Sequence, residues 1–338
     1  MGVDISSIVE RVEINMESLS GKRIAIDAYN AIYQFVSAIR QADGRPLSDT
    51  DGRPTSHLIG ILHRNLRLLQ AGIKPVYVFD GAPNRLKFAT LQKRKEAKMR
   101  AEDRYREAIE KKDMERAYSL AMQTTRLTDE MIAESIRLLT LMGIPFLIAP
   151  EDGEAQASHM ARQGNVWATA SQDFDTLLFG SPRTVRNLTL SSRRRIPGKG
   201  GFSQVKLELV DLEYNLRKLG LSREQMIDMA ILVGTDFNEG IMGIGPKKAL
   251  KIMLENKSIE NTKYVGLPGL EHLDAVRRIF IEPAFTDDYR LEWKRPDGDG
   301  IVDFLCTEHE FDKQGVEQAV ASLNSIAADN QQSLDRWM

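Results

Sequence analysis

The chain has 338 residues, which is enough for one large domain or two of ordinary size. Its composition, 42% hydrophobic and 28% charged, is typical of a globular protein, and no apolar run approaches the roughly 20 residues that span a bilayer. The first residues lack a basic stretch followed by an apolar one, so we expect no secretory signal. The one cysteine, Cys306, excludes intrachain disulfides and favours a reducing interior.

The N-terminal third of the chain alternates predicted strands and helices. Residues 22–32 read as a buried strand that ends at Asp27 and leads into a helix. Residues 75–81 are a second strand, which ends at Asp80, and an amphipathic helix is expected over residues 56–71. Strands that alternate with helices favour an α/β fold with a largely parallel sheet.

Residues 85–143 have a helical composition and are strongly basic at their start. The net charge of −2 argues weakly against a nucleic-acid partner, but nine bases and only three acids lie between Arg85 and Arg106. A charge-rich helix is most often a solvated face with i,i+4 pairs, such as Glu107 with Lys111. Because the bases follow directly after an acidic strand end, we favour phosphate contact.

Two further strands are also followed by acidic residues. Residues 144–164 are a strand, a loop and a helix, and residues 166–180 contain a strand that ends near an Asp-x-Asp pair. In such folds ligands collect at the carboxyl ends of the strands. Acids gathered there without organised histidine or cysteine favour hard divalent cations, magnesium above all. The seven candidate carboxylates are Asp27, Asp80, Asp152, Glu154, Asp173, Asp175 and Asp236.

The next segments are a basic linker and a helical pair. The glycine-rich linker 191–203 is a hairpin or a flexible loop, and it either touches DNA or is solvated. Ser222 with Gln225 predicts a capping box at the start of a helix that ends before Asp236. The last third is less regular, with a strand, a turn and helical structure expected over residues 287–311 and then a polar tail.

A glycine-rich turn precedes the second helix of this pair. Gly243 and Gly245 expose backbone N–H groups that favour phosphate. Lys247 and Lys248 lie in the first helical turn, where the helix dipole disfavours cations, and a bound phosphate would relieve that cost. The alternative is an ordinary helix-turn-helix corner.

Five segments resemble, in order, the signatures of the flap endonucleases, which are structure-specific 5′ nucleases of DNA replication and repair. The segments are IAIDAYNAIYQF, VYVFDG, IAPEDGEAQA, ASQDFDTLLFG and LVGTDFNEGIMGIGPKKAL. They cover residues 1 to about 255, and the GEAQA wording looks like the archaeal branch. The resemblance implies an α/β fold of the PIN-like type: a central mostly parallel sheet, helices on both faces, a helical arch and a helix-hairpin-helix-like DNA-binding motif.

The resemblance also implies a division of the chain into a nuclease core, a closing region and a tail. The 5′ nuclease core would span residues 1–255, with an N-terminal region at 1–84, an arch at about 85–130 and an internal region at 131–255 that contains the DNA-binding motif 222–255. The C-terminal closing region would span residues 256–325, and the clamp-binding tail residues 326–338.

For the active site, the resemblance implies that the seven carboxylates hold two magnesium ions, with manganese as a substitute. Asp27, Asp80, Glu154 and Asp175 are expected to be catalytic together with Lys87 and Arg94. The two bases lie seven residues apart on one helix face and resemble side chains that draw the scissile phosphate onto the metals. Gly2 is where the family places its N-terminus, near the active site.

For DNA binding, Tyr33 matches an aromatic residue on which an unpaired base stacks, and its alternative is a core tyrosine. The segment from Gln34 to Ala71 would be the wedge against the duplex. Gly243, Gly245, Lys247 and Lys248 would grip the duplex backbone, with a potassium ion bound through carbonyls near that turn.

Two positions depart from the family pattern. After the proline the family normally has Ser-Glu, whereas this chain has Glu151-Asp152, so the aligned acid is one methylene shorter. Our hypothesis is that Asp152 still ligates metal, with Glu151 as the substitute. The tail resembles the box that binds the replication sliding clamp (PCNA), but Met338 replaces its second aromatic residue, and we expect weaker binding. The clamp-binding residues are Gln331, Leu334, Trp337 and Met338.

The sequence therefore predicts a magnesium-dependent flap endonuclease with 5′–3′ exonuclease activity, used in Okazaki fragment maturation and repair and recruited by the clamp. Its partners are branched DNA with a 5′ flap and the sliding clamp, without a membrane, and we expect an intracellular monomer. The alternatives are another 5′ nuclease of the superfamily, a catalytically idle DNA-binding scaffold on the clamp, and a PIN-like ribonuclease. The retained carboxylates argue against the scaffold, and the long helical insert and the glycine turn argue against the ribonuclease.

Overall fold

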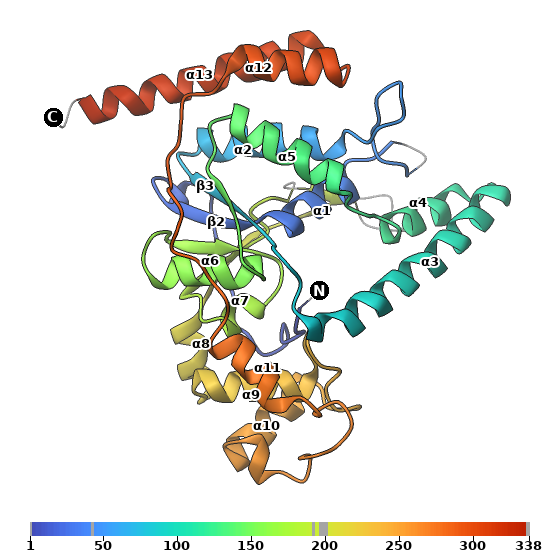
Figure 1. Cartoon of the computed structure of the whole chain (residues 1–338), viewed down its shortest axis with the longest axis vertical. Coiled ribbons are helices and arrows are strands. Elements are labelled where there is room, and N and C mark those ends of the chain that lie inside the picture. The colour runs from blue at the N-terminus through green and yellow to red at the C-terminus, as the bar shows by residue number, and fades with distance from the viewer. Residues whose placement is uncertain (1, 42–43, 191–192, 196–201, 336–338) are drawn as a thin grey trace.

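The computed structural model describes residues 2–41, 44–190, 193–195 and 202–335 (Figure 1). A seven-stranded sheet lies at its centre, in the strand order β1-β9-β6-β5-β2-β3-β4. The strands from β6 to β4 in that order run parallel, and β9 is antiparallel to both β6 and β1. The predicted mostly parallel sheet is therefore confirmed. The strands are β1 (Val12–Ile14), β2 (Arg23–Asp27), β3 (Lys74–Phe79), β4 (Phe146–Ile148), β5 (Ala168–Ala170), β6 (Arg183–Arg186) and β9 (Leu207–Asp211).

The helices agree with the predicted segments at 28–32, 56–71, 85–143, 153–164 and 222–256. The capping box at Ser222 and Gln225 is present. In chain order the helices are α1 (Ala28–Ala38), α2 (Ser56–Gln70), α3 (Phe88–Glu110), α4 (Met114–Gln123), α5 (Asp129–Leu141), α6 (Gly153–Arg162), α7 (Asp175–Leu178), α8 (Leu212–Leu219), α9 (Arg223–Val233), α10 (Pro246–Asn256), α11 (Leu273–Ile281), α12 (Gly298–Val302) and α13 (Lys313–Asp335). None of the helices in the described residues is long and apolar enough to cross a membrane.

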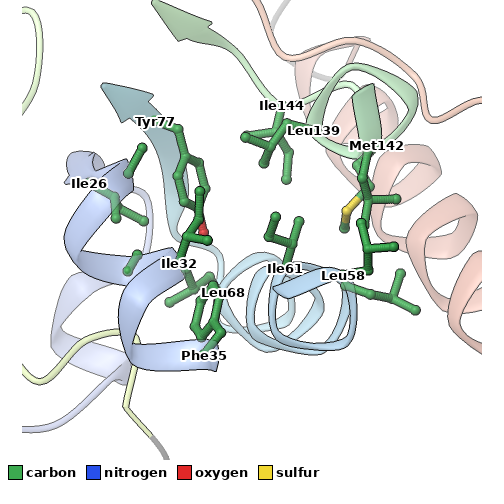
Figure 2. Close-up of a cluster of buried hydrophobic side chains, with 14 of the residues drawn as sticks. Ile26, Ile32, Phe35, Leu58, Ile61, Leu68, Tyr77, Leu139, Met142 and Ile144 are labelled. Carbon is green, nitrogen blue, oxygen red and sulfur yellow. The ribbon is translucent and has the colours of Figure 1, made fainter. Parts of the chain in front are cut away.

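Helices cover both faces of the sheet. On one face α1, α2 and α5 pack against β2 and β3 around fully buried side chains such as Ile26, Phe35 and Tyr77 (Figure 2). The C-terminal helices α12 and α13 close this layer from outside, with Phe304 and Leu323 in the same core. On the other face α6 packs against β2, β3 and β5, and a second core joins α7, α9, α10 and α11.

An extended segment, residues 282–297, covers the sheet beside α6, and we call it the strap. Tyr289, Leu291 and Trp293 pack against the apolar cluster of β3 and α6, and Trp293 Nε1 donates to the carbonyl of Pro75 at 2.9 Å. The strand predicted near this position is wrong, because the described residues of the strap have no strand partner. Large side chains at alternate positions suggest a strand, but here they pack an extended segment against the sheet.

Two other segments lie away from the sheet. α3 and α4 form an antiparallel pair that projects from the body (Figure 1). The linker forms a small hairpin of β7 (Arg193–Arg195) and β8 (Phe202–Gln204), which confirms the hairpin alternative, and residues 196–201 lie outside the described ranges.

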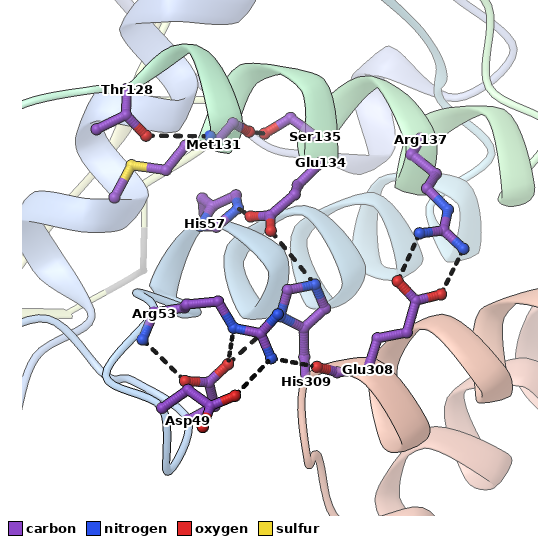
Figure 3. A network of polar contacts seen from close by, with 11 residues as sticks. Asp49, Arg53, His57, Thr128, Met131, Glu134, Ser135, Arg137, Glu308 and His309 are labelled. Carbon is purple, nitrogen blue, oxygen red and sulfur yellow. Dashed lines mark hydrogen bonds and ion pairs between the residues drawn. The ribbon is translucent and has the colours of Figure 1, made fainter.

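A polar network fastens the loop before α2 to the C-terminal segment (Figure 3). His57 Nε2 lies 2.8 Å from Glu134, and His309 Nε2 lies 3.4 Å from the same carboxylate. Arg53 holds Asp49 at 2.8 Å and also donates to the carbonyl of Glu308 at 2.6 Å. Three segments that are distant in sequence, residues 49–57, Glu134 of α5 and residues 308–309, thus share one set of charges.

Candidate active site

The ends of the central strands place the first acids where helices begin. Asp27 closes β2 and caps α1, because its Oδ1 accepts a hydrogen bond from the Asn30 N–H at 3.0 Å. Asp80 directly follows β3, and its Oδ1 accepts from the Gly153 N–H at 2.7 Å. A Cβ at Gly153 would lie 2.8 Å from that oxygen, so a residue without a side chain allows the two loops to approach this closely.

The start of α6 supplies the next two acids. Asp152 caps this helix, with its Oδ1 accepting from the N–H groups of Glu154 and Ala155 at 3.0 and 3.4 Å. Glu154 is buried and accepts from the Ser171 hydroxyl at 2.5 Å. The same Ser171 oxygen accepts from the Asp173 N–H at 3.1 Å. One hydroxyl therefore joins the start of α6 to the loop that carries the next pair of acids.

The N-terminal segment lies against Asp175. The Asp175 Oδ1 accepts from the Val3 N–H at 2.7 Å. Any side chain at Gly2 would overlap the Asp175 carboxylate, so glycine is required for this approach. The position of Gly2 agrees with the one that the family resemblance implies.

The seven carboxylates act on one another electrostatically. Burial, followed by the charge of Asp152, raises the pKa of Asp80 to about 6. Burial, followed by the charge of Asp236, raises the pKa of Asp175 to about 7. Burial, followed by the charge of Asp80, holds the pKa of Asp27 well above its usual range. Burial, followed by the charge of Asp173, does the same for the pKa of Glu154. Each acid disfavours the ionised form of its neighbours, so the cluster needs cations.

Basic side chains of the projecting pair balance some of this charge. Lys87 forms an ion pair with Asp152, and Arg94 forms one with Asp236. Burial by itself would lower the pKa of Lys87, but Asp152, Asp80 and Asp236 outweigh it and raise that pKa above its usual value. The start of α3 is therefore drawn onto the acids.

The donor set fits a hard divalent cation. Its ligating atoms are carboxylate oxygens, which magnesium and manganese prefer. Among the residues that the structure describes, no three acidic, histidine or cysteine side chains converge closely enough to enclose an ion as they stand.

Six of the seven acids line a cavity of about 3430 Å³. The cavity extends from the strand ends along α3 to α4, and Tyr33, Lys87 and Arg94 line it together with all of the candidate carboxylates except Asp175. A cleft of this size, lined by the acids and by bases of α3, suits a long polyanion better than a small molecule.

Comparison with known proteins gives consistent matches over the whole chain. Two family models match: the XPG N-terminal domain over residues 1–101 and the XPG I-region over residues 143–236. Flap endonuclease 1 of Thermococcus onnurineus is 49% identical over 339 residues, which cover 100% of this chain and 99% of that protein. The structure of flap endonuclease-1 from Methanococcus jannaschii matches with a TM-score of 0.79 at 40% identity, covering 97% of this chain and 100% of that one.

The chain belongs to the flap endonuclease family. The predicted resemblance, the α/β nuclease fold and the assignment as a structure-specific flap nuclease are thereby confirmed. The catalytic core of Rad2, solved in complex with a DNA substrate, also matches, with a TM-score of 0.70 at 26% identity over 94% of this chain and 97% of that one.

The structure brings together most of the site residues predicted for this flap endonuclease. Tyr33 is half-buried and lines the cavity, with Lys98 Nζ 5.4 Å from its ring centroid, so it is not a core tyrosine. Glu151 also lines the cavity, but its carboxylate accepts from Asn84 Nδ2 at 3.1 Å. Asp152 therefore reaches the acid cluster and Glu151 lies at its margin.

Other predicted residues lie outside the cavity. The turn from Gly243 to Lys248 is at a separate surface, where a Cβ at Gly243 or Gly245 would meet nothing within 4 Å. Gln331 and Leu334 belong to α13, where the sequence suggests a polar tail. Trp337 and Met338 lie outside the described residues.

Sequence reasoning missed the side chains that position the acids. Ser171 is detectable, because a serine two residues before an aspartate commonly accepts from that residue's N–H. The role of Arg186 is not detectable from the sequence, because Arg186 lies on β6, away from the loop in the chain. Its guanidinium donates to the Gln172 carbonyl at 3.1 Å and lies 4.4 Å from the Phe174 ring centroid. It thereby steadies the loop that carries Asp173 and Asp175.

Removing the Ser171 hydroxyl tests its positioning role. We expect Ser171→Ala to lower the rate of flap cleavage about tenfold or more, because Glu154 and the Asp173 loop lose their common partner. Single-turnover cleavage measures the rate. Ser158→Ala is the matched control, since Ser158 is also buried but donates to the Thr176 carbonyl at 3.3 Å. Equal rates for the two variants would refute the role of Ser171.

Proposed function

We propose that this chain is a magnesium-dependent endonuclease that removes 5′ flaps from branched duplex DNA, with 5′–3′ exonuclease activity as well. The observation that carries the proposal is the position of Lys87 and Arg94, which lie two helical turns apart and pair with acids of the strand-end cluster. A phosphodiester that entered between them and the acids could bind both bases. Replication, in Okazaki fragment maturation, and repair are the processes that such an enzyme serves.

The metal site of the proposal uses the seven carboxylates, from Asp27 to Asp236, to hold two magnesium ions, with manganese as a substitute. Divalent ions bound there would activate water and stabilise the charge that develops on the attacking and leaving oxygens. Lys87 and Arg94 would leave their carboxylate partners and bind the scissile phosphate instead. The phosphate would then lie beside the acids, and the released carboxylates would be able to bind metal. The buried Ser171 and the Val3 N–H keep Glu154 and Asp175 oriented during that exchange.

The duplex would lie along the turn between α9 and α10. Gly245 caps α10 without a side-chain hydrogen bond, and its surroundings are open, so backbone N–H groups at this helix start can face a phosphate. Lys247 and Lys248 add positive charge, and carbonyls of the turn would bind a potassium ion. Tyr33 would stack on an unpaired base, the segment 34–71 would form the wedge, and residues 85–130 would form the arch.

The first experiment compares a labelled duplex that carries a 5′ flap with the matching single strand. We expect cleavage near the flap base in magnesium and none in EDTA. Asp175→Ala should reduce the rate by about a hundredfold or more, because a buried ligand that the Val3 N–H orients would be lost. Tight flap binding with no cleavage by the unaltered chain would instead favour a DNA-binding scaffold, and cleavage of other junctions alone would favour another 5′ nuclease.

A second pair of variants decides which acid after Pro150 serves the metals. We expect Asp152→Ala to raise the magnesium concentration needed for half-maximal cleavage about tenfold or more. Glu151→Ala should change it little, because Glu151 binds Asn84 at the margin of the cluster. A loss confined to Glu151→Ala would reverse the assignment.

The sliding clamp (PCNA) is the proposed protein partner, bound through Gln331, Leu334, Trp337 and Met338. The support is the sequence pattern and its place at the end of α13, which leads away from the nuclease body (Figure 1). We expect Leu334→Ala to weaken clamp binding in calorimetry about tenfold, since an apolar anchor is removed. The control is Ser325→Ala, because Ser325 is an exposed residue of α13 outside the motif. Clamp binding unchanged by Leu334→Ala would exclude this motif.

A further inference from the structure

The edge of the sheet opposite the acids carries cations and a tryptophan. β2, β3, β5 and β6 run parallel, so their first residues lie along one edge and their last residues along the other. β2 begins at Arg23, β3 at Lys74 and β6 at Arg183, and Trp167 directly precedes β5. The Trp167 N–H donates to the Arg23 carbonyl at 2.8 Å, and the Lys74 N–H donates to the Lys22 carbonyl at the same distance.

Trp167 carries two of these cations. Lys22 Nζ lies 5.7 Å and Arg183 Cζ 5.1 Å from its ring centroid, and at such distances a cation is attracted to the ring. Asp211 faces Arg183 in the β6–β9 ladder, but its carboxylate caps α8 by accepting from the Tyr214 N–H at 2.8 Å. The arginine therefore rests on the ring and not on an acid.

Trp293 of the strap carries the other two cations. Arg23 Cζ and Lys74 Nζ both lie 6.0 Å from its ring centroid. The indole is fixed in place, because its Nε1 donates to the Pro75 carbonyl at 2.9 Å. Trp167 packs against the core of α1 and α2, whereas Trp293 packs against the apolar cluster of β3 and α6. The two rings thus lie on opposite faces of the sheet, and the four cations straddle its edge.

These four cations, here called the back row, have no acidic partners. The back row consists of Lys22, Arg23, Lys74 and Arg183. Within the described ranges, no ion pair involves any of them, whereas surface lysines such as Lys206 and Lys313 pair with Glu13 and Glu317. Cations that rings hold in position and that no acid neutralises attract an external anion.

The geometry favours duplex DNA as that anion. From β6 to β3 the row covers three strand spacings of about 4.8 Å, or about 15 Å in all. One strand of a duplex presents a phosphate for each ~3.4 Å of its axis, so several phosphates fit along this length. Cations cover the two rings, so the row offers no apolar anchor of the kind that a protein partner uses. The exposed neighbours of Trp293 add two cations, Lys294 and Arg295, and one acid, Glu292.

We propose that the back row binds the phosphates of a second DNA duplex while the strand-end acids hold the first. The row and the acids lie at opposite ends of the same strands, and DNA bends readily only over about 150 base pairs. A short arm of the DNA in the cavity therefore does not reach the row. The second duplex is either a separate molecule or a distant part of a long one. This inference goes beyond the proposed function, because the row takes no part in cleavage.

The test attaches the full chain to beads through a biotin at its C-terminus. In EDTA the beads are saturated with an unlabelled duplex that carries a 5′ flap, and a labelled plain duplex is then added at several salt concentrations. We expect the unaltered chain to capture the plain duplex. The Lys22→Gln, Lys74→Gln double variant should capture it about fivefold or more weakly, with a slope of log affinity against log salt that is shallower by about two. Its rate of flap cleavage in magnesium should not change.

Two controls separate the loss of the row from other effects. Lys206→Gln, Lys313→Gln removes the same two charges from exposed lysines that pair with acids, and it should capture the plain duplex as the unaltered chain does. Lys22→Arg, Lys74→Arg keeps both charges and should keep the capture.

A second arm of the test distinguishes the two sources of the duplex. In solution, a flap duplex with an arm of several hundred base pairs is compared with a short one. A gain in affinity from the long arm that Lys22→Gln, Lys74→Gln removes would show contact within one molecule, and capture on the beads shows contact with a separate one.

Each result decides the proposal. Absence of both capture and gain, or capture that the double variant retains, would overturn the back row as a DNA site. A polyglutamate peptide that only the unaltered chain retains, without capture of DNA, would overturn it in favour of an acidic peptide. Because the biotin holds the chain on the beads, failure to bind or cut any flap would overturn the proposed function alone.

Discussion

Repulsion among buried carboxylates is the constraint on which the rest of the site depends. Each acid raises the cost of ionising its neighbours, and burial adds to that cost. The fold compensates with fixed donors: N–H groups at helix starts for Asp27 and Asp152, the Gly153 N–H for Asp80 and the Val3 N–H for Asp175. The strand ends, the close glycine contacts and the inward course of the N-terminal segment all serve to bring those donors within reach.

The remaining charge is balanced by side chains that can change partners. Lys87 and Arg94 stand on a helical pair that projects from the body, and they do not belong to the core (Figure 1). Fixed donors orient the acids at all times, whereas these bases can leave a carboxylate for a phosphate at small cost, because both partners are anionic oxygens. The division between rigid donors and exchangeable cations explains how one site can be stable without DNA and still receive it.

Local patterns in the sequence predict the elements and the acids well, because each depends on neighbours in the chain. A strand followed by Asp27, a capping box at Ser222 and a glycine turn before α10 all act within a few residues. The strand expected in the strap is wrong. The large apolar side chains at every second position, Tyr289, Leu291 and Trp293, reflect burial of one side of an extended segment and not hydrogen bonding to a neighbouring strand. Contacts made across the fold, such as those of Arg186 and Ser171, depend on which loops meet, and spacing along the chain does not encode that.

The second family model ends at residue 236, and the residues after it have a structural role. They help to hold the elements that carry the mutually repelling acids. The strap holds α6 from behind: Gln156 exchanges two hydrogen bonds with the Thr286 backbone, at 2.8 and 2.9 Å. Since α6 begins at Asp152 and Glu154, the position of its axis sets where two of the repelling acids lie. On the opposite face, Glu134 of α5 contacts both His57 of α2 and His309, which follows α12 (Figure 3). The C-terminal hundred or so residues thus span the sheet from both sides, and they resist the separation that the charges at the strand ends would otherwise favour.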